Sequence, residues 1–349
     1  MRITAGHLPL GLLLLVAAAP RAEVYELPPE GNDVIGAVGS IVARADDTLL
    51  DVARRHGLGY EDIVRANPGV DIWLPGEGTA VVLPNRFVLP PGPRRGVVLN
   101  LAEYRMYYFP EPKAGEPALV MTFPLSIGRM DWQTPLGLTR VISKVSNPSW
   151  YPPDSVRKEH EDEGRPLPRI VPPGPDNPLG RHAMRLDLPG GAYLIHGTNR
   201  PAGVGMQVTH GCIRMFPEDI GFLFDQVGVD TRVRIINEPV KVGWDGEQLV
   251  MEVHRTLDEA PIAIDETVDG LVVAGPVDAV QVATEKTEDI EPPMRGQLTS
   301  LTVQFVAATN VKPGELDWDF AEQLLERADG IPARVGRTIK NAATSAASE

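Results

Sequence analysis

Proline and glycine set the first limit on the fold of this chain. The 349 residues include 34 prolines and 34 glycines, and both residue types interrupt long helices. A hydrophobic fraction of 43% still supplies enough apolar side chains for a core. The composition therefore predicts a mainly β, turn-rich protein with long loops. The length predicts two or three domains.

Charge narrows the classes of partner. The chain has 33 Lys and Arg against 47 Asp and Glu, a net charge of −14. A strongly acidic chain is repelled by phosphate backbones, so we expect no nucleic-acid partner. Acidity alone does not choose among other partners.

The N-terminus has the pattern of a signal peptide. Arg2 is followed by the apolar run LPLGLLLLV and then by Ala17, Ala18 and Ala19, a typical cleavage region. The run is shorter than the roughly 20 apolar residues of a membrane span. We therefore predict a signal peptide over residues 1–22, with an uncleaved short anchor as the alternative, and no membrane span in the mature form.

Export makes the single cysteine informative. Exported proteins usually pair their cysteines in disulfides, whereas Cys212 has no partner in this chain. An odd cysteine in such a chain is a reactive thiol or an intermolecular link. The alternative is a buried, inert cysteine, so its surroundings have to decide.

Residues 41–84 have the pattern of a small β-α-α-β unit. A strand SIVAR is followed by a helix at 48–56, for which Asp47 is placed as the cap. A second helix at 60–66 is stopped by Asn-Pro-Gly, and a strand follows at 80–84. The motifs D-x-L-x-x-V-A-R-R-x-G and A-N-P-G resemble those of a LysM domain, a glycan-binding module. The alternative is a spacer of the same shape that binds no sugar.

Residues 95–239 have the pattern of a larger β domain. We expect strands at 97–101, 105–109, 118–127, 138–145, 193–195 and 232–236, and a helix at 217–227. The proline-rich segment 147–177 is predicted to be a long loop, which we call the excursion. Loops of this length are often lids or substrate walls. Residues 240–340 form a smaller C-terminal extension with a strand at 249–253 and a helix at 316–328. Residues 341–349 read as a disordered tail.

The chemistry concentrates in YLIHGTNRPAGVGMQVTHGCIRM, residues 193–215. A thiol is nucleophilic as the thiolate, so Cys212 needs a base, and His196 and His210 are both candidates. The amides of Gly211 and Cys212 are candidates for an oxyanion hole. Arg214 offers a fork of donors for a carboxylate. A zinc site formed by His196, His210 and Cys212 is an alternative, but it lacks a fourth ligand at a usual spacing.

The phrases I-H-G-T-N and T-H-G-C-I-R-M resemble the signature of YkuD-type L,D-transpeptidases. Supporting phrases are V-L-N-L, S-I-G-R and T-P-L-G. The order of LysM-like module, catalytic domain and C-terminal extension resembles the periplasmic ErfK/YbiS-like subgroup of Gram-negative bacteria. The resemblance implies a β-sandwich catalytic domain that holds the cysteine at the end of a groove.

The resemblance also assigns roles to residues. It implies that Cys212 is the nucleophile, that His196 is the general base, and that the carbonyl of Gly197 orients its imidazole. It places His210, Arg214 and Asn199 in substrate binding. These assignments are expectations at the level of sequence.

The resemblance implies a reaction and its partners. Cys212 is expected to form a thioester with a peptidoglycan tetrapeptide stem and to pass the acyl group to an amine, with no cofactor and no metal. The expected acceptor is an outer-membrane lipoprotein in the periplasm. Alternatives are 3→3 cross-linking by a diaminopimelate amine, hydrolysis by water, and a non-catalytic peptidoglycan-binding protein.

Overall fold

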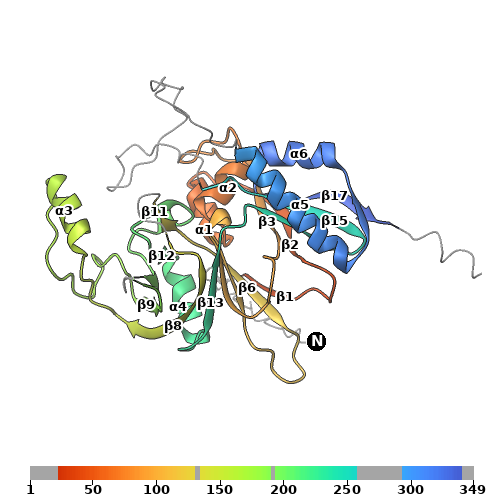
Figure 1. Ribbon diagram of the computed structural model, residues 1–349. Helices are drawn as coiled ribbons and strands as arrows, with labels where there is room; N and C mark the ends of the chain where they lie inside the picture. The colour runs from red at the N-terminus through yellow and green to blue at the C-terminus, as the bar shows by residue number, and fades with distance from the viewer. Residues whose placement is uncertain (1–22, 130–133, 190–192, 258–292, 340–349) are drawn as a thin grey trace, which may run out of the picture.

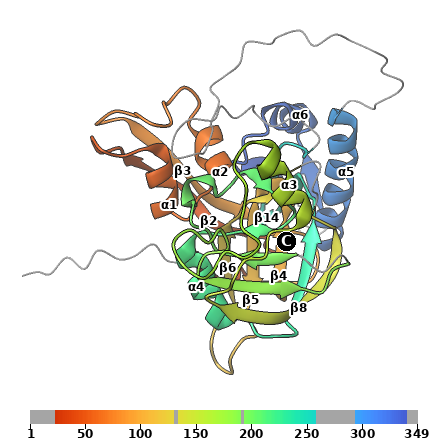
Figure 2. The same cartoon turned by 90° about the vertical axis from the view of Figure 1, so that its left-hand side faces the viewer.

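The computed structural model describes residues 23–129, 134–189, 193–257 and 293–339, and the statements below concern these residues. A central sheet carries an N-terminal β-α-α-β unit and a C-terminal α/β unit (Figure 1). In Figure 2 both units again lie on the same side of the strands β4, β5, β6 and β8. The predicted signal peptide and tail lie outside the described residues.

The N-terminal unit consists of β2 (Val34–Val42), α1 (Leu49–Arg55), α2 (Tyr60–Ala66) and β3 (Ala80–Val88). The element order agrees with the sequence, but the β2–β3 hairpin pairs from Val34–Val88 to Val42–Ala80 and so extends beyond residues 41–84. The predicted cap was wrong. Thr48 caps α1 and forms a capping box with Asp51, whereas Asp47 pairs with Arg55 at 2.6 Å.

The central sheet confirms the mainly β prediction. Its nine strands run in the order β1-β6-β5-β4-β13-β8-β9-β10-β12. In that order the bounds are Glu23–Glu26, Leu119–Pro124, Arg105–Phe109, Gly96–Asn100, Arg232–Ile236, Gly137–Ser146, His182–Leu186, Leu194–His196 and Ile213–Arg214. The short strands β7 (Ile127–Gly128) and β11 (Gln207–Thr209) form a separate pair.

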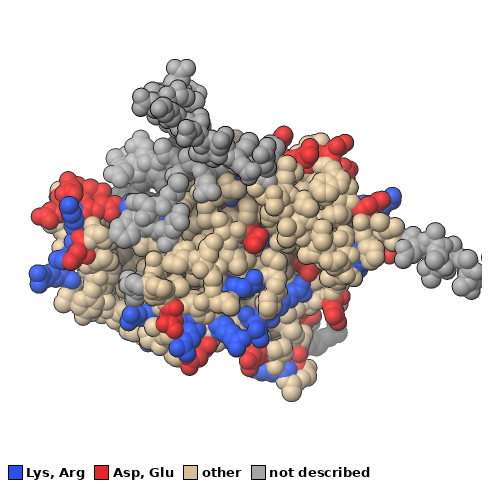
Figure 3. Space-filling model, viewed as in Figure 1, with Lys and Arg blue, Asp and Glu red and all other residues tan. Residues whose placement is uncertain are grey.

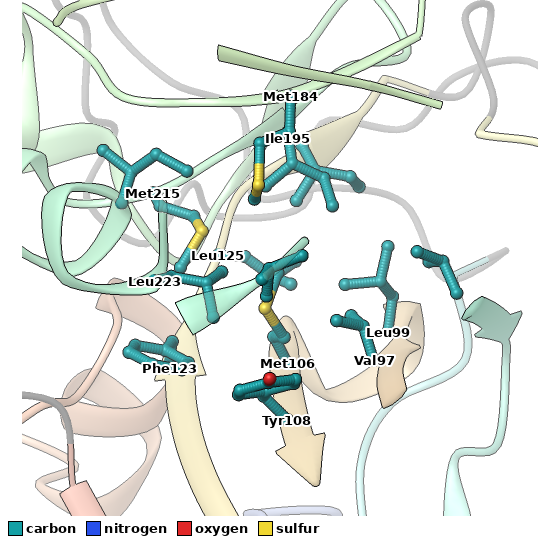
Figure 4. Packing of buried hydrophobic residues seen from close by; sticks show 14 of the residues in the cluster. Val97, Leu99, Met106, Tyr108, Phe123, Leu125, Met184, Ile195, Met215 and Leu223 are labelled. Atoms are coloured by element: carbon teal, nitrogen blue, oxygen red, sulfur yellow. The ribbon is translucent and has the colours of Figure 1, made fainter. Parts of the chain in front are cut away.

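The sheet curls around one hydrophobic core. Side chains from opposite ends of the strand order, such as Met106 on β5 and Ile195 on β10, belong to the same buried cluster. Figure 4 shows Met106, Phe123 and Tyr108 close to Met184, Ile195 and Met215. Helix α4 (Pro217–Gln226) contributes Ile220 and Leu223 to this core. Curling thus lets one sheet enclose a core between two facing halves, as a sandwich does.

The N-terminal unit packs against the outer face of the same sheet. Val98, Tyr107 and Val120 of the central strands share a buried cluster with Leu49 and Ile63 of the unit. Alternation along the strands places these three side chains opposite the core. The unit is therefore joined to the central sheet through a common hydrophobic interface.

The C-terminal extension is a folded unit of its own. Strands β14 (Val240–Asp245), β15 (Gln248–Val253), β17 (Ala333–Thr338) and β16 (Gly314–Leu316) form a sheet, covered by α5 (Pro293–Val311) and α6 (Trp318–Arg327). Trp244 is fully buried there, and its indole donates to the carbonyl of Ala308 at 2.9 Å. The sequence predicted β15 and α6 but missed β14, β16, β17 and α5.

A buried ionic cluster joins the three parts. Lys241 of β14 contacts Glu103 of the 3-10 turn Leu101–Glu103, and its Nζ lies 3.0 Å from Glu252 of β15. The same Nζ donates to the carbonyl of Val88 at 2.7 Å, and His254 lies 2.7 Å from Glu252. Side chains of Lys241, Glu103 and Glu252 are at most 1% exposed. The cluster therefore connects β3 of the N-terminal unit, the turn that follows β4 of the central sheet, and the C-terminal extension.

Within the described residues, no helix has the length and apolar character needed to cross a membrane.

Candidate active site

The neighbouring strands β10 and β12 bring the predicted residues together. They pair in parallel, with Ile195 opposite Ile213 and His196 opposite Arg214. Ile195 and Ile213 point into the core. Because side chains alternate along a strand, His196 and Arg214 face the other way, and Cys212, two residues before Arg214, shares their side of the sheet. This alternation places the predicted nucleophile and base in one pocket.

Local hydrogen bonds hold the loop that presents the thiol. Gly211 has φ +93°, a left-handed conformation that favours glycine. The Thr134 hydroxyl donates to the carbonyl of Gly211 at 3.0 Å, and the Thr209 hydroxyl donates to the carbonyl of Cys212 at 2.5 Å. The glycine before the cysteine is thus favoured by the backbone turn.

His196 is held in one tautomer. Its Nδ1 lies 2.6 Å from the carbonyl oxygen of Gly197. A carbonyl only accepts, so Nδ1 carries the proton and Nε2 keeps its lone pair. Burial, with the nearby positive charge of Arg214, lowers the pKa of His196 to about 3, against the opposing bond to Gly197. The imidazole is therefore neutral at neutral pH and able to accept a proton at Nε2.

The thiol is neutral in the free protein. Burial raises the pKa of Cys212, while a backbone hydrogen bond from Leu194 and the charge of Arg214 oppose that rise. The pair Cys212 and His196 thus rests as thiol and imidazole rather than as an ion pair. A nucleophilic role for this thiol would therefore require transfer of its proton during the attack on a substrate.

Arg214 is a charged group short of partners. Burial, together with repulsion from Arg200, lowers its pKa to about 10, although Cys212 opposes this. Its Nε is buried and has no hydrogen-bond partner among the described residues. An unpaired guanidinium beside the thiol is suited to a carboxylate of the substrate.

The pocket around Cys212 has a volume of about 310 Å³. The long excursion supplies one wall through Trp150, Tyr151, Pro153 and Val156, as the sequence predicted for a segment of that length. Helix α3 (Asp154–Asp162) forms within the excursion and lies well to one side of the C-terminal unit (Figure 1).

Glu159 of α3 was not found by sequence reasoning. Its carboxylate pairs with His210 at 2.7 Å and with Arg129 at 2.9 Å. Burial raises the pKa of Glu159, but the hydrogen bonds from His210 and Arg129 outweigh that effect and lower it overall. No sequence pattern connects Glu159 with these residues.

Two further residues distinguish the structure from the expectation. Asn199 is exposed and is not among the residues that line the pocket, and its role in substrate binding stays a prediction. Arg185 does line the pocket. Arg185 belongs to β9 and lies opposite Leu194 of β10. The alternation of side chains along β9 is the sequence pattern that could have indicated its position.

Ligand geometry also addresses the zinc alternative. Among the described residues, the one group of three side chains with metal-ligand atoms within 4.8 Å of one another is Glu103, Glu252 and His254. The ammonium of Lys241 lies among them and already supplies the countercharge. His196, His210 and Cys212 are not gathered in this way, so their geometry does not support a zinc site.

Comparison with known proteins agrees with this geometry. Residues 94–235 match the family model described as the YkuD L,D-transpeptidase catalytic domain. The chain belongs to the YkuD-type L,D-transpeptidase family, and it is an enzyme of the transferase class.

Individual relatives place it in the ErfK/YbiS-like group. The chain is 41% identical to "Probable L,D-transpeptidase YcfS" of Escherichia coli over 70% of this chain and 76% of that protein. It is 37% identical to "Probable L,D-transpeptidase ErfK/SrfK" of Salmonella typhimurium over 93% and 94%. A solved structure of L,D-transpeptidase 3 from Mycobacterium tuberculosis covers 45% of this chain and 66% of its own, with 20% identity and a TM-score of 0.29.

Proposed function

We propose that the chain is a cysteine L,D-transpeptidase that uses Cys212 as nucleophile and His196 as general base. The observation that carries this proposal is the shared pocket of the two side chains, together with the 2.6 Å contact between His196 Nδ1 and Gly197. That contact leaves Nε2 as the basic atom. Nε2 of His210 is engaged by Glu159, which favours His196 over His210 as the base.

The reaction proceeds in two acyl transfers. As Cys212 attacks the carbonyl of the third stem residue, meso-diaminopimelate, His196 takes the thiol proton and a C–S bond forms. The C–N bond to D-alanine then breaks, and the proton passes to the departing amine. An acceptor amine attacks the thioester, a new C–N bond forms, and the C–S bond breaks to restore the thiol. The amides of Gly211 and Cys212 are the proposed donors to the oxyanion.

The substrate is held by charge and by apolar contact. Arg214 offers its unpaired Nε to a carboxylate of the stem, and Arg185 lies at the same pocket. Trp150 and Tyr151 of the excursion provide apolar surface for the peptide. Peptidoglycan stems have carboxylates along a peptide backbone, so both features fit.

A single mass measurement tests the nucleophile. Purified protein incubated with a tetrapeptide muropeptide should release D-alanine and acquire the acyl mass on the tryptic peptide that contains Cys212. Cys212→Ala should do neither while it keeps the thermal unfolding midpoint of the parent. Appreciable D-alanine release by the folded Cys212→Ala variant would refute the assignment of Cys212 as nucleophile. The same result would also exclude a non-catalytic binding protein.

For the acceptor we propose the terminal lysine of an outer-membrane lipoprotein, with the protein exported to the periplasm. The order of N-terminal unit, catalytic domain and extension supports this choice, and the acidic net charge of −14 suits a basic acceptor tail. Digests of sacculi from a deletion strain should lose lipoprotein-derived peptide. Loss of 3→3 dimers instead would assign the alternative acceptor, and accumulation of uncleaved tetrapeptides alone would indicate hydrolysis.

We propose that the N-terminal unit binds glycan as a LysM-like module. Trp73 and Leu74 are exposed in the loop between α2 and β3, and exposed aromatic side chains are common anchors in recognition. Trp73→Ala should weaken retention on sacculi. Deleting the whole unit is a poor test, because it would uncover Tyr107 and Val98 of the catalytic sheet. Unchanged retention of Trp73→Ala would favour the spacer alternative.

A further inference from the structure

A second groove lies outside the catalytic pocket. It has a volume of about 660 Å³ and is formed where β8, β13 and the start of β4 meet. Its lining shares no residue with the pocket of Cys212. The lining residues are Pro93, Arg95, Val97, Leu138, Thr139, Arg140, Asp187, Asp230, Arg232, Val233 and Arg234.

Arginine dominates the charge of this groove. The two acidic residues of the lining, Asp187 and Asp230, both pair with Arg140, at 3.2 and 2.8 Å. Arg95, Arg232 and Arg234 are left without an ion pair among the residues that the structure describes. We call this groove, with these three arginines in its lining, the arginine groove.

Strand geometry aligns two of these side chains. Arg232 and Arg234 are two residues apart on β13, so they lie on one face of the strand at a spacing of about 7 Å. Val233 between them points into the core. The β8 neighbours Arg140 and Leu138 lie opposite Arg232 and Arg234, and Leu138 is 81% exposed. The groove therefore combines a row of cations with an exposed apolar side chain.

Arg234 is held in place without an ion pair among the described residues. Its guanidinium lies against Gly92, where a Cβ would approach Nη1 to 3.0 Å. Its Nη2 is buried and has no hydrogen-bond partner in the described part of the chain. Burial lowers the pKa of Arg234, and Glu238 only partly opposes this. A buried, unsatisfied donor on a cation costs free energy that an anionic ligand would recover.

The groove contrasts with the rest of the molecule. The chain has a net charge of −14, yet on the side shown in Figure 3 most of the visible Lys and Arg atoms lie in the lower part of the view, interspersed with some Asp and Glu atoms, while acidic atoms predominate over α6. A local cationic surface on an acidic protein selects for anionic partners.

We propose that the arginine groove is a second binding site for the carboxylate groups of peptidoglycan stem peptides, separate from the donor site at Cys212. This inference rests on the proposed function, which makes peptidoglycan the substrate. Planar guanidinium forks match carboxylates bidentately. A sacculus presents many stems, so a second weak site raises retention on the polymer through multivalency. A single soluble muropeptide gains nothing from it.

The test compares two double variants of the full chain. Arg232→Gln with Arg234→Gln removes two charges of the groove. Arg255→Gln with Arg334→Gln removes two exposed charges outside the groove, on residues that form no ion pair within the part of the chain that the structure describes. Co-sedimentation with purified sacculi should weaken by roughly an order of magnitude for the groove variant and hardly change for the control. Rising salt should reduce the difference.

Further measurements separate a binding site from a loss of folding or of activity. Both double variants should unfold at the parent temperature, and a carbapenem should acylate Cys212 in them at the parent rate. Equal losses in the two double variants, or unchanged retention of the groove variant, would overturn the proposal. The proposal would also be overturned if the groove variant lost binding to anionic phospholipid vesicles but kept its binding to sacculi. Retention is measured equally well in Cys212→Ala, so failure of the proposed reaction is distinguishable from failure of this site.

Discussion

Oε2 of Glu159 lies 2.7 Å from Nε2 of His210, although 51 residues separate them along the chain. The same carboxylate binds Arg129. Glu159 therefore joins the excursion that walls the pocket to the loop that carries Cys212, and it acts as a positioning residue.

Glu159→Gln should loosen this wall. An amide keeps the shape of the side chain but loses the charge that strengthens both contacts. We expect KM for a soluble tetrapeptide muropeptide to rise by a few-fold to about ten-fold, with kcat changed much less. The matched control is Glu161→Gln, an exposed glutamate of the same helix. A fall in kcat at unchanged KM would contradict a role in shaping the pocket.

The two histidines should differ strongly in their effect on acylation. His196→Ala removes the proposed base and should slow carbapenem acylation of Cys212 by about 10²–10⁴-fold. His210→Ala removes the contacts to Glu159 and Arg129 but leaves the proposed base in place, and it should cost less than roughly ten-fold. The increase in protein mass with time gives both rates. A larger loss at His210 would exchange the roles of the two imidazoles.

The pH profile follows from the depressed basicity of His196. Its pKa of about 3 lies far below the ordinary value of about 6.5, so the imidazole stays unprotonated as the pH falls from about 8 to about 5. We expect the carbapenem acylation rate of the free enzyme to be nearly flat across this range. An acidic limb with a midpoint near 6.5 would show that His196 titrates as an ordinary histidine.

Lys241 should matter for stability rather than for chemistry. Its removal leaves Glu103 and Glu252 buried without their cation, and breaking a buried pair typically costs about 3–5 kcal/mol. Lys241→Met should therefore lower the thermal unfolding midpoint by many degrees. Lys158→Met, at an exposed position of α3, is the control and should change little. A midpoint equal to that of the parent would show that the cluster contributes no net stability.

Local patterns of the sequence were sufficient for much of the fold. Helix α2 and strand β13 begin and end where the sequence predicts, because their apolar periodicity and their stop signals are local. The same holds for the start of α4 at Pro217. The N-cap was assigned one residue too early, to Asp47 instead of Thr48, because both residue types cap helices and only the backbone angles choose between them.

The sequence by itself determined the family and predicted which residues carry the chemistry. The single cysteine, the two histidines and the arginine lie in one short segment, and their order alone indicates the chemistry. Tertiary structure decided which groups face them. The tautomer of His196 and the contact of His210 with Glu159 depend on strand register and burial. So does the buried Nε of Arg214, which has no hydrogen-bond partner among the described residues. These are set by residues far away in the chain.

The features that the sequence did not predict are those that depend on contacts between distant parts of the chain. Glu159, Lys241 and the arginine groove have no local signature, since each is defined by neighbours brought close through pairing of distant strands or through folding of the excursion. A charged side chain has the same letters whether it is solvated, paired or buried without a partner. Its free energy differs among these states because desolvation and Coulomb attraction depend on the three-dimensional surroundings.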